Sequence, residues 1–471
     1  MDVERQQGKW TQPSLFEARE GQVRHGGSGE GGTGAGPTEE SQADTASTRG
    51  RALASGKMER ICERENLNRA YKRVKRNKGA PGIDGMPVGA LYDWLQEHKA
   101  ELIGSLLDGS YQPQEVLGVE IPKAGGGKRQ LGIPTVVDRL VQQAILQVLG
   151  PEWDETFSEQ SYGFRPGRDA HQAVRRGAEY VREGRQIVVD MDLEKFFDRV
   201  NHDVLMARVA RRVQDKRLLR IIGRFMRAGM MRDGVRVERY EGTPQGGPLS
   251  PLLANLLLDD LDKELERRGH RFCRYADDCN IYVWTRGAGE RVLASMTRFV
   301  EERLRLRVNR AKSAVARVWE RKFLGYRLLP GGKLGIAAES MERAKQRVRW
   351  ITRRNRGISL ERMIQQLNEY LTGWVTYYRY AACKEHLRRM EEWIRRKLRC
   401  VKLKQRKRAK PIADFLQSQG MPEWRAWLLA LSGKGWWRKA GSPQAHEAMT
   451  SAWFESLGLE SLTGRYAALN Q

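Results

Sequence analysis

The spacing of apolar side chains changes along the chain and separates segments of different predicted structure. Residues 58–99 carry apolar side chains at helical spacing. The stretch at 79–85, rich in Gly and Pro, breaks this pattern and predicts a turn between helical elements. From 111 to 335, short apolar runs alternate with helical stretches, and residues 119–121 and 187–189 are predicted to be strands.

A long apolar run in the middle of the chain predicts a buried helix. Ser250 is expected to be its N-cap residue, with Pro251 at the first helical position. The run from 252 to 265 would then be largely buried. The order of elements is mixed and lacks the regular strand–helix repeat of a doubly wound sheet, so it indicates an α+β protein.

The net charge of the chain indicates a kind of binding partner. The 471 residues carry a formal net charge of +26, which implies a polyanionic partner, either nucleic acid or an anionic membrane surface. Residues 1–57 are rich in Gly, Ser, Thr and Glu and have a net charge of −1, so the other 414 residues carry +27. We expect residues 1–57 to be a disordered leader, and the basic character to belong to folded parts.

The basic residues concentrate in one aromatic-rich segment. Residues 341–410 hold 22 Lys and Arg against 6 Asp and Glu, at helical spacing and interleaved with Trp and Tyr. A solvated charged face is the ordinary explanation for a basic run, but this density of aromatic residues favours nucleic-acid contact. Arg395, Arg396 and Lys397 are expected to contact phosphate. Residues 411–471, which include Trp424, Trp427, Trp436 and Trp437, predict a small helical module.

Other features exclude several classes of protein. No apolar run approaches the eighteen or more residues that a membrane span needs, and the first residues lack the apolar segment of a secretory signal. The five cysteines include no CxxC pair, so neither a disulfide framework nor a zinc site is expected, and a reducing cytoplasm fits.

Two acidic motifs carry the candidate chemistry. Asp277 and Asp278 lie between two apolar runs that predict strands joined by a tight turn; because Asp favours turns, a hairpin with solvated acids is an equally good local interpretation. The second motif follows the strand predicted at 187–189, where Asp190 and Asp192 share one face. Phosphoryl transfer with two divalent cations needs carboxylates from separate strands. The pattern alone does not choose between Asp190 and Asp192.

Together these motifs resemble the palm of reverse transcriptases. The particular residues within them resemble those of the reverse transcriptase/maturase encoded in group II introns. The matching segments are 79–85 (GAPGIDG), 121–123 (IPK), 131–135 (LGIPT), 161–168 (SYGFRPGR), 188–198, 244–251 (PQGGPLSP), 274–278 (RYADD) and 323–326 (FLGY). Downstream, 373–378 (GWVTYY) resembles the maturase, or thumb, region. The resemblance covers about residues 58–471, and so many motifs in one order are specific although each alone is weak.

The resemblance implies a role for individual residues. It selects Asp192 over Asp190 as the metal-binding aspartate and makes Asp277 and Asp278 the rest of a catalytic, metal-binding triad for Mg²⁺, with Mn²⁺ as a substitute. Five further residues would bind substrate: Lys123 and Arg129 the triphosphate, Phe197 the sugar as a gate, Gln245 the incoming nucleotide, and Lys312 the region near the triphosphate. Gly125–Gly127 would let the fingers loop close over a triphosphate, although a plain glycine hairpin fits the same residues.

The family pattern also implies an architecture and partners. The expected fold is α+β, a right-hand polymerase with an antiparallel palm sheet, an α-helical thumb and a small helical DNA-binding module. We expect a leader at 1–57, an N-terminal extension at 58–103, fingers and palm at 104–335, a thumb or maturase domain at 336–410 and the DNA-binding module at 411–471. The implied partners are intron RNA, an RNA template with a DNA primer, target DNA and deoxynucleoside triphosphates, without a membrane.

One further domain is expected to be absent, and two alternatives remain beside this prediction. Many intron proteins carry a C-terminal endonuclease with paired Cys and His, and the absence of such pairs here predicts that it is missing. A retron, diversity-generating or CRISPR-associated reverse transcriptase would share the palm but not the long basic thumb. A splicing maturase with a decayed polymerase would lack the intact acidic motifs.

Overall fold

The computed structural model describes residues 56–122, 127–232, 235–238, 240–243 and 246–470. The sequence-predicted leader therefore lies outside the described residues except at its end, where Lys57 is already the first residue of helix α2. Mixed helices and sheets agree with the predicted α+β class. Among the described residues, no helix combines the length and apolar composition needed to cross a membrane.

Helices form the first part of the described chain, as the apolar spacing predicts. They are α2 (Lys57–Cys62), α3 (Arg64–Asn77), η1 (Val88–Ala90) and α4 (Leu91–Leu107). The stretch at 79–85 separates α3 from η1, which confirms the predicted break. Met58 and Ile61 are fully buried, so α2 belongs to the core rather than to a solvated leader.

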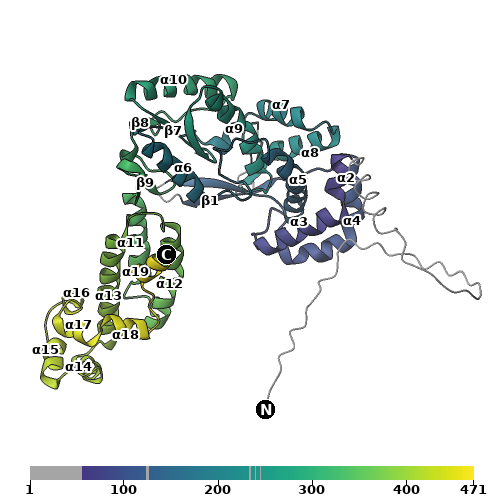
Figure 1. The fold of residues 1–471 in the computed structure, drawn as a ribbon. Coiled ribbons are helices and arrows are strands. Elements are labelled where there is room, and N and C mark those ends of the chain that lie inside the picture. The colour runs from purple at the N-terminus through teal and green to yellow at the C-terminus, as the bar shows by residue number, and fades with distance from the viewer. Residues whose placement is uncertain (1–55, 123–126, 233–234, 239, 244–245, 471) are drawn as a thin grey trace, which may run out of the picture.

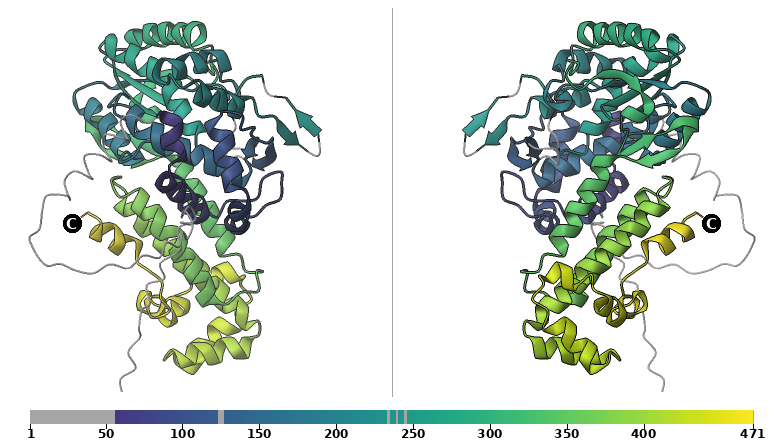
Figure 2. Two further views of the ribbon diagram at one scale, coloured as in Figure 1. Left: turned by 90° about the vertical axis from the view of Figure 1, so that its right-hand side faces the viewer. Right: turned by 90° about the vertical axis from the view of Figure 1, so that its left-hand side faces the viewer.

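A four-stranded sheet follows, in the order β2-β1-β4-β5. Its strands are β1 (Val116–Pro122), β2 (Lys128–Ile133), β4 (Met230–Arg232) and β5 (Val235–Val237). The predicted strand at 119–121 is part of β1. β1 and β2 are antiparallel, β1 and β4 parallel, and the β4–β5 hairpin extends away from the rest of the body (Figure 2).

The second four-stranded sheet carries the acidic motifs. Its order is β6-β7-β3-β8, with every pair antiparallel. The strands are β3 (Ile187–Met191), β6 (Arg271–Tyr275), β7 (Asp278–Val283) and β8 (Ala314–Arg317). The predicted strand at 187–189 is confirmed, and so is the pair of strands around Asp277.

Alternation along the strands places two cores on the two faces of this sheet. Val189 and Ile281 pack into one core with the long helices behind the sheet, whereas Val188 and Tyr282 pack into the other with α6. The helices around the two sheets are α5 (Val136–Asp154), α6 (Ala170–Arg182), η2 (Phe196–Asp198), α7 (His202–Arg212), α8 (Lys216–Arg227), α9 (Ser250–Arg267) and α10 (Arg286–Arg303). The sheet is thus covered on both sides, with α6 opposite α9 and α10 (Figure 1).

Helix α9 confirms the predicted buried helix but corrects its first residue. Leu249, not Ser250, is the N-cap residue, and Pro251 lies at the second helical position. The Ser250 hydroxyl instead accepts a hydrogen bond from the Thr243 hydroxyl at 3.0 Å. The Ser250 side chain, which local sequence rules assign to the helix cap, therefore forms a hydrogen bond with another segment instead.

The remaining chain is almost entirely helical. Its elements are η3 (Val318–Glu320), β9 (Tyr326–Leu328), η4 (Pro330–Gly332), β10 (Leu334–Ile336), α11 (Ala338–Ile351), α12 (Leu360–Tyr377), α13 (Lys384–Arg406), α14 (Ala409–Ser418), α15 (Glu423–Ala430), α16 (Trp436–Lys439), α17 (Pro443–Ala448), α18 (Ser451–Ser456) and α19 (Leu462–Ala468). The helices from α11 onward form a body below the sheets, with α14 to α18 at its far end (Figure 1). Their apolar side chains join the core that also holds α6.

Candidate active site

Asp192 directly follows β3, and a neighbouring turn fixes its backbone. The amide N–H of Asp192 donates to the Ser313 hydroxyl at 3.0 Å, and its carbonyl accepts from the Asn309 amide at 2.8 Å. The same turn brings the Lys312 ammonium to 4.0 Å from one carboxylate oxygen of Asp192. The structure therefore brings together two of the residues that the sequence singled out.

Asp190 shares the sheet face of Asp192 but has a partner of its own. Its carboxylate forms an ion pair with Arg321 at 2.6 Å, and Arg321 also donates to the Lys312 carbonyl at 2.6 Å. Burial raises the pKa of Asp190, and the hydrogen bond from Arg321 acts against that rise. Arg321 thus already engages the Asp190 carboxylate, and the role of Asp192 as the metal ligand stays a prediction of the family pattern.

The β6–β7 turn presents the other two aspartates. Met191, the last residue of β3, pairs with Cys279 across the antiparallel strands. Asp192 follows Met191 and Asp278 precedes Cys279, so both lie next to this pair at one edge of the sheet. Asp277 lies in the turn just before β7. The tight turn between two strands is as predicted. Its aspartates lie near Asp192 at the end of β3 and are not simply solvated acids of an isolated hairpin.

The electrostatics of Asp278 show how crowded these carboxylates are. Its pKa is raised to about 7. Although the residue as a whole is exposed, the protein atoms around its carboxyl group are the largest cause, followed by the negative charges of Asp277, Asp190 and Asp192. The positive charge of Lys312 acts in the opposite direction. A bound cation would relieve this repulsion.

The donor set suits a divalent cation of the hard, oxygen-binding type. Asp192 and Asp278 come from separate strands and Asp277 from the connecting turn, and carboxylate oxygens are the ligands that Mg²⁺ prefers. Within the described ranges, no three His, Cys, Asp or Glu side chains already converge on one metal-binding point. The chemistry of the donors fits the ion; its coordination geometry is not defined by the protein alone.

Phe197 lies in η2, close to the loop that contains Gln245. The Phe197 carbonyl accepts a hydrogen bond from the Thr243 amide at 2.7 Å. Gly242 has a φ of +88°, and a Cβ atom there would meet the Phe197 carbonyl oxygen at 2.9 Å, so glycine is needed for this approach. The Phe197 side chain is almost completely buried. Gln245 itself lies outside the described residues.

The predicted triphosphate-binding residues belong to the β1–β2 hairpin. Lys123 and residues Gly125–Gly126 lie outside the described part of the chain. Arg129 is within β2, where its backbone pairs with Ile121. The structure thus shows β1 paired with β2, and triphosphate binding by Lys123 and Arg129 stays a prediction.

Several residues near the acidic strand ends were missed as functional candidates. Ser313 and Arg321 follow Lys312 closely in sequence, but neither belongs to a motif that signals a role. Gly163 and Arg274 were quoted only as parts of motifs, and both contact the Asp277 turn. Three of these residues, Ser313, Arg321 and Gly163, contact the acidic segments from other parts of the chain. A local sequence pattern does not predict such contacts.

Known proteins share both parts of this arrangement. The reverse transcriptase (RNA-dependent DNA polymerase) family matches residues 121–328, and the group II intron maturase-specific domain matches residues 341–420. Protein YkfC of Escherichia coli is 33% identical over 311 residues, which are 57% of this chain and 81% of YkfC. Group II intron-encoded protein LtrA of Lactococcus lactis is 36% identical over 197 residues, 41% of this chain but 32% of LtrA.

A solved structure with weaker similarity is the partial Cas6-RT-Cas1–Cas2 complex, with a TM-score of 0.35 and 26% identity over 53% of this chain and 43% of that chain.

The family match and these relatives define the class: this is an RNA-directed DNA polymerase of the reverse transcriptase fold. Reverse transcriptases of this class depend on divalent metal ions and bind nucleic acid. With the maturase-specific domain following the polymerase domain, the chain belongs to the group II intron-encoded reverse transcriptase/maturase family.

The position of Phe197 leads to a prediction about sugar selection. Phe197→Val should increase incorporation of ribonucleotides relative to deoxynucleotides by about tenfold or more, because a smaller side chain removes the steric block to a 2′-hydroxyl. The measurement is single-nucleotide extension with each nucleotide type. Phe196→Val is the matched control, since Phe196 is equally buried in the same turn. An unchanged ratio in the Phe197 variant, or an equal change in both, would contradict the gate role.

Proposed function

We propose that this chain copies RNA into DNA at a site formed by Asp192, Asp277 and Asp278, and that it binds group II intron RNA to assist splicing. The single observation that carries the proposal is the pairing of Met191 with Cys279 at the end of β3, because Asp192 and Asp278 lie next to this pair at one edge of the sheet, beside the turn with Asp277. Carboxylates crowded in this way, with the pKa of Asp278 raised first by burial and then by the charges of its neighbours, are typical of sites that gain from cation binding.

Different side chains of the proposed site have different roles in nucleotidyl transfer. A pair of Mg²⁺ ions, when bound, would activate the primer 3′-hydroxyl and neutralise charge on the departing pyrophosphate. Asp192, Asp277 and Asp278 would hold these ions. Lys312, near Asp192, is placed to stabilise negative charge on the triphosphate. Lys123 and Arg129 on the β1–β2 hairpin are proposed to bind the triphosphate, and Gln245 and Phe197 to contact the nucleotide.

The helical body supports a second role as an RNA-binding thumb. Exposed Trp350 has the guanidinium groups of Arg347 and Arg356 at 4.5 and 4.4 Å from its ring centroid. Arg349 and Lys397 flank the ring of Trp393 at 5.7 and 5.0 Å. Alternating cations and aromatic rings of this kind suit the phosphates and unstacked bases of RNA.

The structure changes which cations are the best candidates. Arg395 is paired with Glu391 at 3.7 Å, and Arg396 stacks on Trp437 at 4.3 Å. Burial lowers the pKa of Lys397, and so does the charge of Arg349. Arg349 on α11 also has a partner, Glu342 at 2.5 Å, but its side chain is 49% exposed against 21% for Arg395. Arg347 is exposed as well, so we assign phosphate contact to Arg347 and Arg349 before the Arg395–Lys397 run.

Residues 336–410 are proposed as the thumb or maturase domain and 411–471 as a module that binds target DNA. Exposed Trp424, Leu428 and Leu431 lie on one side of α15 and its end, with Lys434 and Arg438 close in sequence. The maturase-specific match supports the intron assignment over retron-like alternatives, and the intact Asp192, Asp277 and Asp278 support a working polymerase over a decayed one.

Separation of the two activities tests the proposal. The double variant Arg347→Ala and Arg349→Ala should weaken intron RNA binding and flatten its salt dependence by about 1.4 in log–log slope, because each contact to single-stranded RNA contributes about 0.7. Splicing assistance should fall with binding. Asp277→Asn should do the opposite, losing primer extension while it keeps RNA affinity and splicing.

The measurements are RNA binding across salt concentrations, intron splicing and primer extension, side by side. Arg267→Ala with Arg268→Ala is the matched control, since it removes the same charge from the end of α9, where both residues pair with Glu264. Unchanged RNA affinity of the α11 double variant at every salt concentration would reject the thumb assignment. Loss of splicing by a folded Asp277→Asn protein would reject the division of roles.

A further inference from the structure

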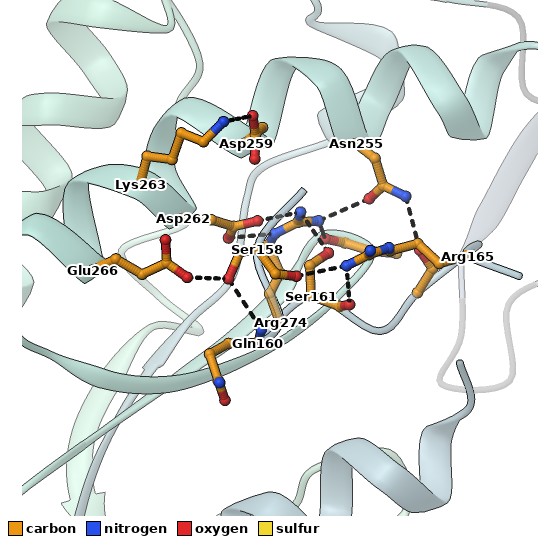
Figure 3. Close-up of polar contacts among 12 residues, drawn as sticks. Ser158, Gln160, Ser161, Arg165, Asn255, Asp259, Asp262, Lys263, Glu266 and Arg274 are labelled. Atoms are coloured by element: carbon orange, nitrogen blue, oxygen red, sulfur yellow. Dashed lines mark hydrogen bonds and ion pairs between the residues drawn. The ribbon is translucent and has the colours of Figure 1, made fainter. Parts of the chain in front are cut away.

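Arg274 is a fully buried cation immediately before the turn that holds Asp277. Neither Arg274 nor its partner Asp262 on α9 is exposed to solvent. The guanidinium donates to both carboxylate oxygens of Asp262, from Nε at 2.7 Å and from Nη2 at 2.5 Å. Figure 3 shows this pair at the centre of a network of polar side chains.

The three remaining N–H groups of Arg274 are also used. Nη2 donates to the Ser161 hydroxyl at 2.8 Å, and Nη1 donates to the Asn255 side-chain oxygen at 3.0 Å and to the Ala276 carbonyl at 2.9 Å. A guanidinium group has five N–H donors in a fixed plane, so every donor of Arg274 has an acceptor.

The contact with Ala276 fixes the peptide that leads into Asp277. Ala276 has a φ of +57°, a left-handed conformation that a residue with a side chain rarely adopts without support. The peptide between Ala276 and Asp277 carries both the Ala276 carbonyl and the Asp277 amide, so the hydrogen bond to that carbonyl sets the orientation from which the Asp277 side chain projects.

A second part of the network supports the same turn from the other side. Asn255 donates to the Gly163 carbonyl at 2.8 Å, and Gly163 lies directly against the Tyr275–Ala276 backbone. The main chain of Arg274 is bonded to this loop as well, with its amide donating to Gln160 and its carbonyl accepting from Tyr162, each at 2.9 Å. Arg274 therefore joins α9, the 160–163 loop and the turn.

Stability alone does not explain such a pair. Replacing a buried ion pair with well-packed apolar residues is often neutral or stabilising, because removing two charges from water is costly. An apolar pair would, however, leave the Ala276 carbonyl and the Asn255 side chain without donors. The planar fork of arginine is what reaches Asp262, Asn255, Ser161 and Ala276 at once.

We propose that Arg274 is a positioning residue for the metal-binding turn: it holds the Ala276–Asp277 peptide in the orientation in which Asp277 binds a divalent cation. The inference rests on the proposed function of Asp277. Arg274→Lys keeps the charge beside Asp262 but loses the fork, so the turn should lose its support while the buried charge pair remains.

The experiment measures Mn²⁺ binding to the full-length protein by electron paramagnetic resonance, together with primer extension as a function of Mg²⁺ concentration and the melting temperature. Arg274→Lys should weaken Mn²⁺ binding about tenfold and raise the half-saturating Mg²⁺ concentration by a similar factor, with activity partly restored at high Mg²⁺. A merely structural role would lower the melting temperature and leave both metal dependences unchanged.

Arg165→Lys is the matched control. Arg165 is also buried and holds the same loop through Asp154 at 2.6 Å and the Ser161 carbonyl at 3.0 Å. Its hydrogen bonds within the described part of the chain go to Asp154, Ser158 and Ser161 and not to the Ala276–Asp277 turn, so its replacement should destabilise the protein without changing metal affinity. An equal loss of metal affinity in both variants would overturn the proposal.

Two further variants keep the outcomes separate. If Arg274→Lys does not fold, Asn255→Ser is the milder substitution, because it removes only the link between Arg274 and Gly163. It should still weaken Mn²⁺ binding about threefold. Unchanged Mn²⁺ binding in this variant would overturn the inference. Asp277→Asn should lose Mn²⁺ binding altogether. If it binds Mn²⁺ as the unaltered protein does, the proposed metal site is wrong; if it loses binding while Arg274→Lys keeps it, only the role of Arg274 is wrong.

Discussion

Asp192→Asn is expected to lower primer extension on an RNA template by at least ~1,000-fold, which corresponds to about 4 kcal/mol in the activation barrier. The change removes the charge of a proposed metal ligand directly after β3, next to the Met191–Cys279 pair. Its backbone contacts with Ser313 and Asn309 involve main-chain atoms of Asp192, so they remain available in the variant. The loss should therefore appear in catalysis rather than in folding, and the measurement is the extension rate at saturating nucleotide with the melting temperature beside it.

The neighbouring aspartate provides a sharp comparison. Asp190→Asn should retain activity within about tenfold, because Arg321 already engages Asp190 at 2.6 Å and an amide oxygen can still accept a hydrogen bond from it. Asp203→Asn, an exposed aspartate on α7, controls for the general effect of losing one negative charge. If Asp190→Asn is as inactive as Asp192→Asn, or if Asp192→Asn extends primers normally, the assignment of the metal ligand fails.

Gly163→Ala is expected to lower primer extension by at least about a hundredfold. A Cβ atom at this position would lie 2.9 Å from the Tyr275 carbonyl carbon and 3.0 Å from Ala276 Cα, and closer still to the Ala276 amide nitrogen. These are backbone atoms of the turn before Asp277, which cannot rotate away as a side chain can. Displacement of about 1 Å in a reacting geometry is enough for losses of this size.

Gly104→Ala provides the control for the glycine substitution itself. Gly104 lies within α4, and a Cβ atom there would meet nothing within 4 Å, so alanine should leave activity unchanged and favour the helix slightly. Primer extension and thermal unfolding of the two variants give the comparison. Normal extension by Gly163→Ala would show that the turn tolerates a shift, and that the contact does not control the position of Asp277.

Local chemistry in the sequence was enough to predict the strands and the turn that carry the acidic motifs. Apolar runs on either side of Asp277 and Asp278 predicted two strands and a tight connection, because Asp favours turns and alternating apolar side chains favour strands. The same local rules failed at Ser250, where the Thr243 hydroxyl bonds the serine and the helix begins with Leu249 as its N-cap. Capping rules use neighbouring residues only, and here a residue seven positions away decided the outcome.

By itself the sequence determined the family, the α+β class, the identities of the candidate metal ligands and the basic, aromatic character of the helical body, since each of these depends on residue types and their order. The pairing of Asp190 with Arg321, of Arg274 with Asp262, and of Gly163 with the Asp277 turn was decided only by the tertiary structure. The two ion pairs join residues that are 12 and 131 positions apart in the chain. The Gly163 contact is between main-chain atoms, which residue types do not reveal. The register between β3 and β7 pairs Met191 with Cys279 and so brings Asp192 and Asp278 to one edge of the sheet. This register depends on how whole strands pack, because both of their faces are covered by apolar side chains from distant helices.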